Sequence, residues 1–124
     1  MGLLKLTPMM WTDQFRETID FYKTHLGFDC VSMDADLGWA AMQRDGIELM
    51  ISRPNEHTPF DRPTFTGTFY FVTDDASTLW KQLKDKAKIV YPLEDFEWQM
   101  REFAIYDNNG YMLQFGQDIS TDQE

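Results

Sequence analysis

Two tryptophans, Trp39 and Trp98, have the chemistry needed to hold a flat ligand. Aromatic rings bury a large apolar area at low entropic cost, and offset stacking on another ring adds about 0.5–1.5 kcal/mol. Trp39 lies in a predicted strand, where packing in the core is the alternative to a ligand contact. Trp98 is expected to be exposed, because acidic and polar residues surround it: Glu94, Asp95, Glu97 and Gln99.

The other candidate ligand residues are aromatic or acidic. Phe60, in a proline-rich loop, and Phe96, beside Trp98, are further aromatic candidates for the same ligand site. The carboxylates of Glu48, Asp61 and Glu102, together with the acids beside Trp98, would give this site a negative potential that attracts a cationic ligand. For each acid, the alternative is a solvated surface charge that contacts no ligand.

Composition limits the partners and the compartment. The 124 residues include 21 acidic and 11 basic ones, for a net charge of −10, and such a surface repels nucleic-acid phosphates. Charged residues interrupt every apolar run, so no stretch approaches the roughly 18 apolar residues of a membrane-spanning helix. The single cysteine, Cys30, has no partner for an internal disulfide, and the N-terminal segment lacks the pattern of a signal peptide. We therefore expect a cytoplasmic protein with no nucleic-acid or membrane partner.

No catalytic residue is predicted. His25 falls near the end of a predicted helix, where a cation is favourable, and His57 falls in the proline-rich loop, so a structural or surface role is expected for both. The sequence has no Ser-His-Asp or Cys-His spacing and no phosphate-binding glycine loop. These absences argue against covalent catalysis.

The elements that position these residues begin with a strand and a helix. An apolar segment over residues 3–11 predicts a strand, with Pro8 at an edge or a hinge. Thr12 and Asp13 are typical of a helix start, and Gly27 is placed to end the helix. One face of this helix carries an apolar stripe made of Phe15, Ile19, Tyr22 and Leu26.

A hairpin and a loop follow the helix. The turn sequence at residues 44–46 separates two strands over residues 39–43 and 47–51. Three prolines within residues 53–63 predict a loop that crosses to the second half of the chain.

The second half repeats the order of the first. A shift of 61 residues, from Phe15 to Ala76, makes the two helical stripes coincide. The chain therefore predicts an α+β fold in one domain over residues 1–124, with two tandem βαβββ modules, about residues 1–55 and 64–120, forming a concave mixed sheet. In the second module we expect a strand over 65–72, a helix cap at 73–75 before the helix, strands near 89–91, 101–106 and 111–115, and a turn at 107–110.

Three motifs occur in order along the chain. They are Asp13 with Phe21-Tyr22 and Leu26-Gly27-Phe28, then Arg44-Asp45-Gly46-Ile47-Glu48-Leu49, then Trp98-Gln99-Met100-Arg101-Glu102-Phe103 followed by Asp107-Asn108-Asn109-Gly110. Together they resemble the glyoxalase/bleomycin-resistance/extradiol dioxygenase superfamily, also called vicinal oxygen chelate. The third motif is most similar to the bleomycin-resistance branch.

The resemblance also implies where metal ligands would lie. The four positions fall on Thr7, Glu48, Gly67 and Gln114, and only Glu48 is an anionic ligand. One carboxylate and a neutral amide are too few to hold zinc, nickel or iron tightly. We therefore expect neither a metal nor another cofactor; the alternative is a glyoxalase- or dioxygenase-type enzyme with a non-standard ligand set.

In the bleomycin-resistance proteins that the chain resembles, a flat drug lies in a groove between two subunits. Trp98 and Trp39 match the aromatic positions of that groove, and Pro8 matches a hinge for exchanged N-terminal strands. The resemblance thus implies a homodimer that sequesters a planar, cationic, bleomycin-like compound without chemistry. The alternative for Pro8 is an ordinary edge strand, and the alternatives for the protein are the metalloenzyme above and a non-catalytic dimerisation module.

Overall fold

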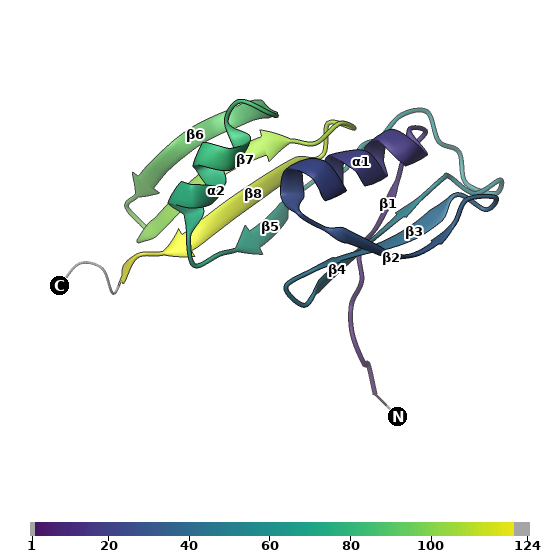
Figure 1. Cartoon of the computed structure of the whole chain (residues 1–124), viewed down its shortest axis with the longest axis horizontal. Helices are drawn as coiled ribbons and strands as arrows, with labels where there is room; N and C mark the ends of the chain where they lie inside the picture. The colour runs from purple at the N-terminus through teal and green to yellow at the C-terminus, as the bar shows by residue number, and fades with distance from the viewer. Residues whose placement is uncertain (1, 121–124) are drawn as a thin grey trace. The chain divides into compact units, whose positions relative to one another are not determined.

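The computed structural model describes residues 2–120 of the chain. Their strands form two four-stranded mixed sheets, and the chain divides into two compact units between Pro63 and Thr64 (Figure 1). Each unit runs in the order strand, helix, strand, strand, strand. The predicted α+β class and the repeated βαβββ order are therefore confirmed.

The first unit pairs its first and last strands in parallel. Its sheet has the order β1-β4-β3-β2, and the other neighbouring pairs are antiparallel. A parallel pair needs a crossover connection, which α1 supplies here together with the β2–β3 hairpin. The elements are β1 (Met9–Trp11), α1 (Phe15–Leu26), β2 (Asp29–Asp34), β3 (Trp39–Arg44) and β4 (Ile47–Ser52).

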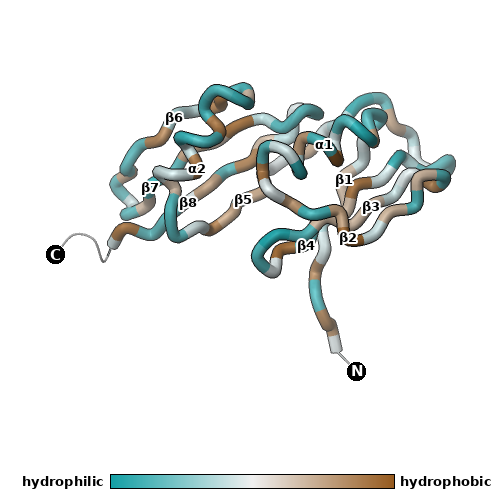
Figure 2. Tube along the Cα trace, viewed as in Figure 1, coloured by the Kyte–Doolittle hydropathy of each residue, from teal (hydrophilic) through white to brown (hydrophobic). Residues whose placement is uncertain are grey.

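The core of the first unit lies between α1 and the sheet. Hydropathy alternates along α1 (Figure 2), and its buried residues recur at helical spacing: Phe15, Thr18, Ile19, Tyr22 and Leu26. Ala40, Met42, Leu49 and Ile51 occupy alternate strand positions and are buried, and Ala41 between them is buried as well. Because strand side chains alternate between faces, Glu48, Met50 and Ser52 point to the face opposite α1.

The second unit repeats this plan. Its sheet has the order β5-β8-β7-β6, with β5 parallel to β8. Stacked or tilted rings form its core, because Trp80 of the helix lies on Phe103, Phe103 on Phe115, and Phe115 on Phe71, with centroid distances of 5.0–5.4 Å. The elements are β5 (Phe69–Val72), α2 (Ala76–Leu83), β6 (Lys88–Phe96), β7 (Met100–Tyr106) and β8 (Met112–Asp118).

Both first strands are shorter than predicted. Pairing of β1 with β4 starts at Met9, because Pro8 has no N–H to donate and uses only its carbonyl, which accepts from the Met50 N–H. β5 starts at Phe69 because the hydroxyl of Thr68 already donates to the carbonyl of Met112, 3.1 Å away. The helix start predicted at Thr12 was early: the Thr12 N–H still pairs with Ser52, and α1 begins at Phe15.

β6 is longer than predicted. It extends to Phe96, and the register between β6 and β7 shifts on either side of Tyr91. Pro92 fits within this edge strand because a bulge removes the need for its missing N–H. The segment before Trp98 is therefore a strand that ends in a turn.

Neither helix in the part of the chain that the structure describes is long and apolar enough to cross a membrane.

The β3–β4 turn depends on two left-handed residues, Asp45 at φ 51° and Gly46 at φ 81°. We expect Gly46→Ala to lower the free energy of unfolding by about 1 kcal/mol, because Cβ disfavours positive φ. A Cβ there would meet no atom within 4 Å, so the effect is purely conformational. Urea denaturation checks it, with Gly46→Asn as the control that should recover part of the loss. An unchanged midpoint in the alanine variant would contradict this account.

Asp75 caps α2 as predicted, because its carboxylate accepts from the Thr78 N–H at 3.0 Å and from the Thr78 hydroxyl at 2.8 Å. These hydrogen bonds hold the pKa of Asp75 below its ordinary value. A lowered folded-state pKa gives stability that is complete above the unfolded pKa and is lost as pH falls through the folded pKa.

Asp75→Asn should therefore lower the urea midpoint at neutral pH, and its difference from the wild type should shrink toward about pH 2.5. Asp74→Asn removes a neighbouring carboxyl without touching Thr78 and is the matched control. A difference between wild type and Asp75→Asn that stays constant with pH would refute the proton linkage.

Candidate functional site

The predicted ligand residues are divided between the two units. Trp39, Glu48, Phe60 and Asp61 belong to the first, and Phe96 and Trp98 belong to the second. Each group has its own local geometry.

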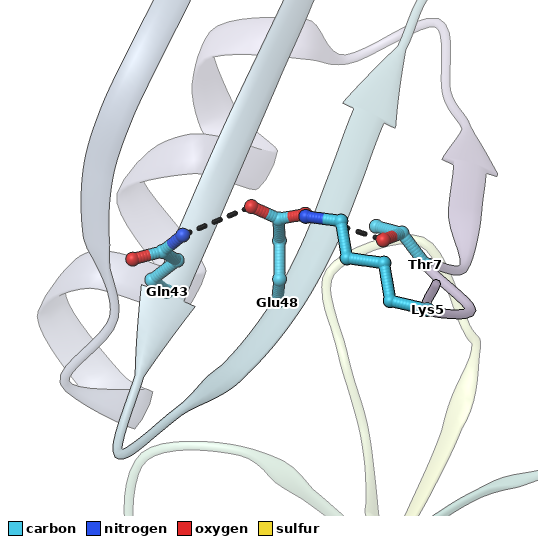
Figure 3. Close-up of polar contacts among 4 residues, drawn as sticks. All are labelled: Lys5, Thr7, Gln43 and Glu48. Carbon is cyan, nitrogen blue, oxygen red and sulfur yellow. Dashed lines mark hydrogen bonds and ion pairs between the residues drawn. The ribbon is translucent and has the colours of Figure 1, made fainter. Parts of the chain in front are cut away.

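Glu48 is bound by residues of its own unit (Figure 3). One carboxylate oxygen accepts from Lys5 Nζ at 2.6 Å and from the Thr7 hydroxyl at 3.2 Å, and the other accepts from Gln43 Nε2 at 2.9 Å. The hydrogen bond from Lys5, followed by that from Gln43, lowers the pKa of Glu48. The carboxylate predicted to attract a ligand is thus neutralised by the N-terminal arm.

Trp39 and Trp11 lie on the same face of the first sheet. Both residues are cross-strand partners of Ser52, Trp39 on β3 and Trp11 on β1. Trp11 was not among the predicted ligand residues, yet the Phe60 ring packs edge-on against it with centroids 6.4 Å apart. Trp39 is half-buried, and Asp61 is exposed. The loop therefore brings Phe60 to Trp11, while Asp61 stays exposed.

A row of three aromatic rings lies in the second unit. Trp98 is 57% exposed and stacks on Phe96, with ring centroids 4.6 Å apart and planes at 13°. The third ring, Tyr91, packs edge-on against Phe96, with ring centroids 5.8 Å apart. The carboxylate of Asp95, next to Phe96, is already paired, because it accepts two hydrogen bonds from the guanidinium of Arg101. Trp98 is thus exposed, as the sequence predicted, and it stacks on the half-buried Phe96.

A hydrogen-bonded cluster spans all four strands of the second sheet on the face opposite α2. Glu102 of β7 accepts hydrogen bonds from the hydroxyls of Tyr70 on β5 and Tyr91 on β6, the second at 3.4 Å. Gln114 of β8 donates to the Tyr91 hydroxyl at 2.8 Å. Glu102 is only 5% exposed. We call Tyr70, Tyr91, Glu102 and Gln114 the Glu102 cluster.

Burial, and then the hydrogen bond to Glu102, raise the pKa of Tyr70 well above its ordinary range. Burial also raises the pKa of Tyr91. Both phenols therefore keep their protons at neutral pH and act as donors.

The tyrosines of the cluster were missed by sequence reasoning. Tyr70 lies in the run Phe69-Tyr70-Phe71, which is apolar enough to indicate core alone. The available signal was alternation: Phe71 packs on Phe115 toward α2, so Tyr70 faces the other way. The pairing of Tyr70 with Gln114 appears only in the strand register.

The four ligand positions implied by the resemblance do not fit a transition metal. Thr7 donates to Glu48, Gln114 donates to Tyr91, and Gly67 has no side chain. Among residues 2–120, no three His, Cys, Asp or Glu side chains come together as a metal site. The donor chemistry therefore offers one carboxylate, already paired with Lys5.

The histidines and Pro8 have local contacts of their own within the first unit. His25 packs edge-on against Phe21 in the last turn of α1, and the backbone N–H of His57 donates to the Asn55 side chain. Pro8 directly precedes β1, and upstream of it Leu3, Leu4 and Leu6 are exposed.

Comparison with solved structures gives the same fold. A protein of unknown function from Agrobacterium tumefaciens str. C58 is 18% identical, with TM-score 0.79 and coverage of 94% of this chain and 95% of that one. TioX from Micromonospora sp. ML1 is 17% identical, with TM-score 0.74 and coverage of 93% and 98%. Lactoylglutathione lyase from Agrobacterium tumefaciens is 13% identical, with TM-score 0.71 and coverage of 94% of both chains.

A comparison with curated proteins gives no match. The sequence model of one family matches residues 6–115, which is most of the chain. The chain therefore belongs to the Glyoxalase/Bleomycin resistance protein/Dioxygenase superfamily.

Proposed function

We propose that this protein binds and sequesters a planar, cationic small molecule, without a metal and without converting it, as the bleomycin-resistance proteins of its superfamily do. The observation that carries this proposal is the exposed Trp98 stacked on Phe96. A large aromatic side chain left in solvent on a rigid support is typical of a binding surface. A bleomycin-like compound and a role in antibiotic resistance belong to this proposal, as does the cytoplasmic location expected from the single cysteine.

The charge of the chain supports a cationic ligand. The net charge of −10 favours the approach of cations and disfavours anions such as phosphates. Two exposed carboxylates, Glu94 and Glu97, are close in sequence to Phe96 and Trp98. Glu102 is the cross-strand partner of Glu94 on the neighbouring strand β7. A flat cation would therefore find both a ring to stack on and negative charge beside it.

A homodimer with exchanged N-terminal strands is part of the proposal. The support is the arm before Pro8, whose three leucines are solvent-exposed and would be covered by a second copy. Pro8, Trp39, Phe60 and Asp61 keep their proposed roles as hinge and ligand residues.

Binding should depend on Trp98. We expect Trp98→Ala to lower the affinity for proflavine, a flat cation, and for copper-free bleomycin about tenfold in calorimetric titrations, because the stacking area is lost. Trp39→Ala tests the first unit in the same assay. Trp80→Phe is the control, since Trp80 packs on Phe103 in the core. Unchanged affinity in Trp98→Ala, with a loss in Trp39→Ala, would move the stacking surface to the first unit.

Binding should also be independent of metal. Treatment with EDTA should leave the proflavine affinity and the melting temperature unchanged, since the implied ligand positions offer a single carboxylate. Elemental analysis of the untreated protein should find less than about 0.1 transition-metal ion per chain for a site this poor in ligands. One tightly held ion per chain would instead favour the enzymes of the superfamily.

A further inference from the structure

The buried carboxylate of Glu102 has no cationic partner among residues 2–120. Its hydrogen bonds there come only from the hydroxyls of Tyr70 and Tyr91. Glu48, in the first unit, contrasts with it, because Lys5 supplies a full positive charge to that carboxylate. A buried carboxylate is costly to keep unless charge or hydrogen bonds compensate it. Among the described residues, Glu102 therefore has hydrogen-bond donors but no positive charge beside it.

The hydrogen bonds of the Glu102 cluster leave acceptor capacity unused. Both phenol protons point at Glu102, and Gln114 Nε2 points at the Tyr91 oxygen. The lone pairs that accept no hydrogen bond within the cluster belong to the Tyr70 oxygen, the Gln114 carbonyl oxygen and the carboxylate of Glu102. A ligand group that fits this arrangement has to be a hydrogen-bond donor.

One oxygen of Glu102 is incompletely satisfied. Its Oε1 has a single described donor, Tyr91, at 3.4 Å, whereas O–H···O bonds are usually about 2.7–2.8 Å long. A charged N–H donor would bind this oxygen at shorter range and with greater strength than the distant phenol. Of the two Glu102 oxygens, Oε1 is therefore the one at which an N–H donor of a ligand would add the stronger hydrogen bond.

Tyr70 covers this carboxylate from an edge strand of the sheet. Its ring lies over Gly116, where a Cβ would stand 1.9 Å from the phenol oxygen, so only glycine allows the ring to reach Glu102. Tyr70 is itself 42% exposed, so the residue that covers Glu102 is in contact with solvent. Glu94, exposed and in register with Glu102, adds a second carboxylate at the same level of the sheet.

The Glu102 cluster continues directly into the aromatic row. Tyr91 belongs to both, because its hydroxyl contacts Glu102 and its ring meets Phe96 edge-on. Beyond Phe96 lies the exposed ring of Trp98. A stacking surface and a buried anion are thus joined through one residue within the second unit.

We propose that the Glu102 cluster is the subsite for the positively charged nitrogen of the ligand, an ammonium, amidinium or aminoaromatic cation. This inference rests on the function proposed above and adds to it the residues that select charge. Tyr70 and Tyr91 also present ring faces that attract cations. The flat part of the ligand lies along the aromatic row of Tyr91, Phe96 and Trp98, and its N–H groups reach Glu102 Oε1 at the Tyr91 end of the row.

The test compares two probes with the same three-ring frame: proflavine, a cation at neutral pH, and acridine, which is mostly neutral there. Calorimetric titration should give tighter binding of proflavine to the wild type. Glu102→Gln should lower the affinity for proflavine about tenfold or more, because a charge-assisted hydrogen bond is lost. It should change the affinity for acridine less than about twofold. Asp85→Asn removes one exposed charge of the same unit, in the turn after α2 and outside the proposed site, and should change the proflavine affinity less than about twofold in physiological salt.

Tyr70→Phe is the second variant, in case Glu102→Gln does not fold. It removes a donor from Glu102 without removing the charge, so proflavine affinity should hold or rise, whereas a merely structural cluster would lose affinity for both probes. Equal effects of Glu102→Gln and Asp85→Asn on the proflavine affinity would overturn the charged subsite while leaving the stacking surface in place. Failure of both probes to bind the wild type would overturn the stacking surface and this subsite together.

Discussion

Each unit is organised by the parallel pairing of its first and last strands. The β1–β4 and β5–β8 ladders require the chain to cross over between them, and the crossover helix covers one face of each sheet. Alternate strand residues then pack under the helix, and the intervening ones are released from core packing. Glu48, Glu102 and Gln114 all occupy such released positions. These three polar side chains therefore lie on the sheet faces that the helices leave uncovered.

Two carboxylates on these faces have opposite surroundings. Glu48 is held by a lysine, a threonine and a glutamine, so its charge is already balanced. Glu102 is held by two phenols that contribute protons but no positive charge. The first environment suits the attachment of an N-terminal arm, and the second suits a cation supplied from outside. Sequence reasoning gave both acids the same role, since residue type does not specify a neighbour.

The superfamily contains resistance proteins and dioxygenases, and a lactoylglutathione lyase shares the fold, so the fold alone does not select a function. The residues at the implied metal-ligand positions are more informative than the fold. A threonine, a glycine and a glutamine stand where chelating side chains are implied by the family resemblance. Gln114 is informative, because its amide serves as a donor to Tyr91 and so takes part in a hydrogen-bonded cluster instead of a coordination sphere.

The sequence by itself determined the secondary structure of both modules, because helical stripes, the Asp45-Gly46 turn, Gly27 and the Asp75 cap are local signals. It also identified Phe96 and Trp98 as neighbours, since only one residue separates them. It did not determine the ends of β1, β5 and β6, which depend on where a partner strand stops, on the Thr68 side chain and on a bulge. Nor did it bring Tyr70, Tyr91 and Gln114 to Glu102: these residues lie on four different strands, and only the register of the folded sheet decides which side chains meet.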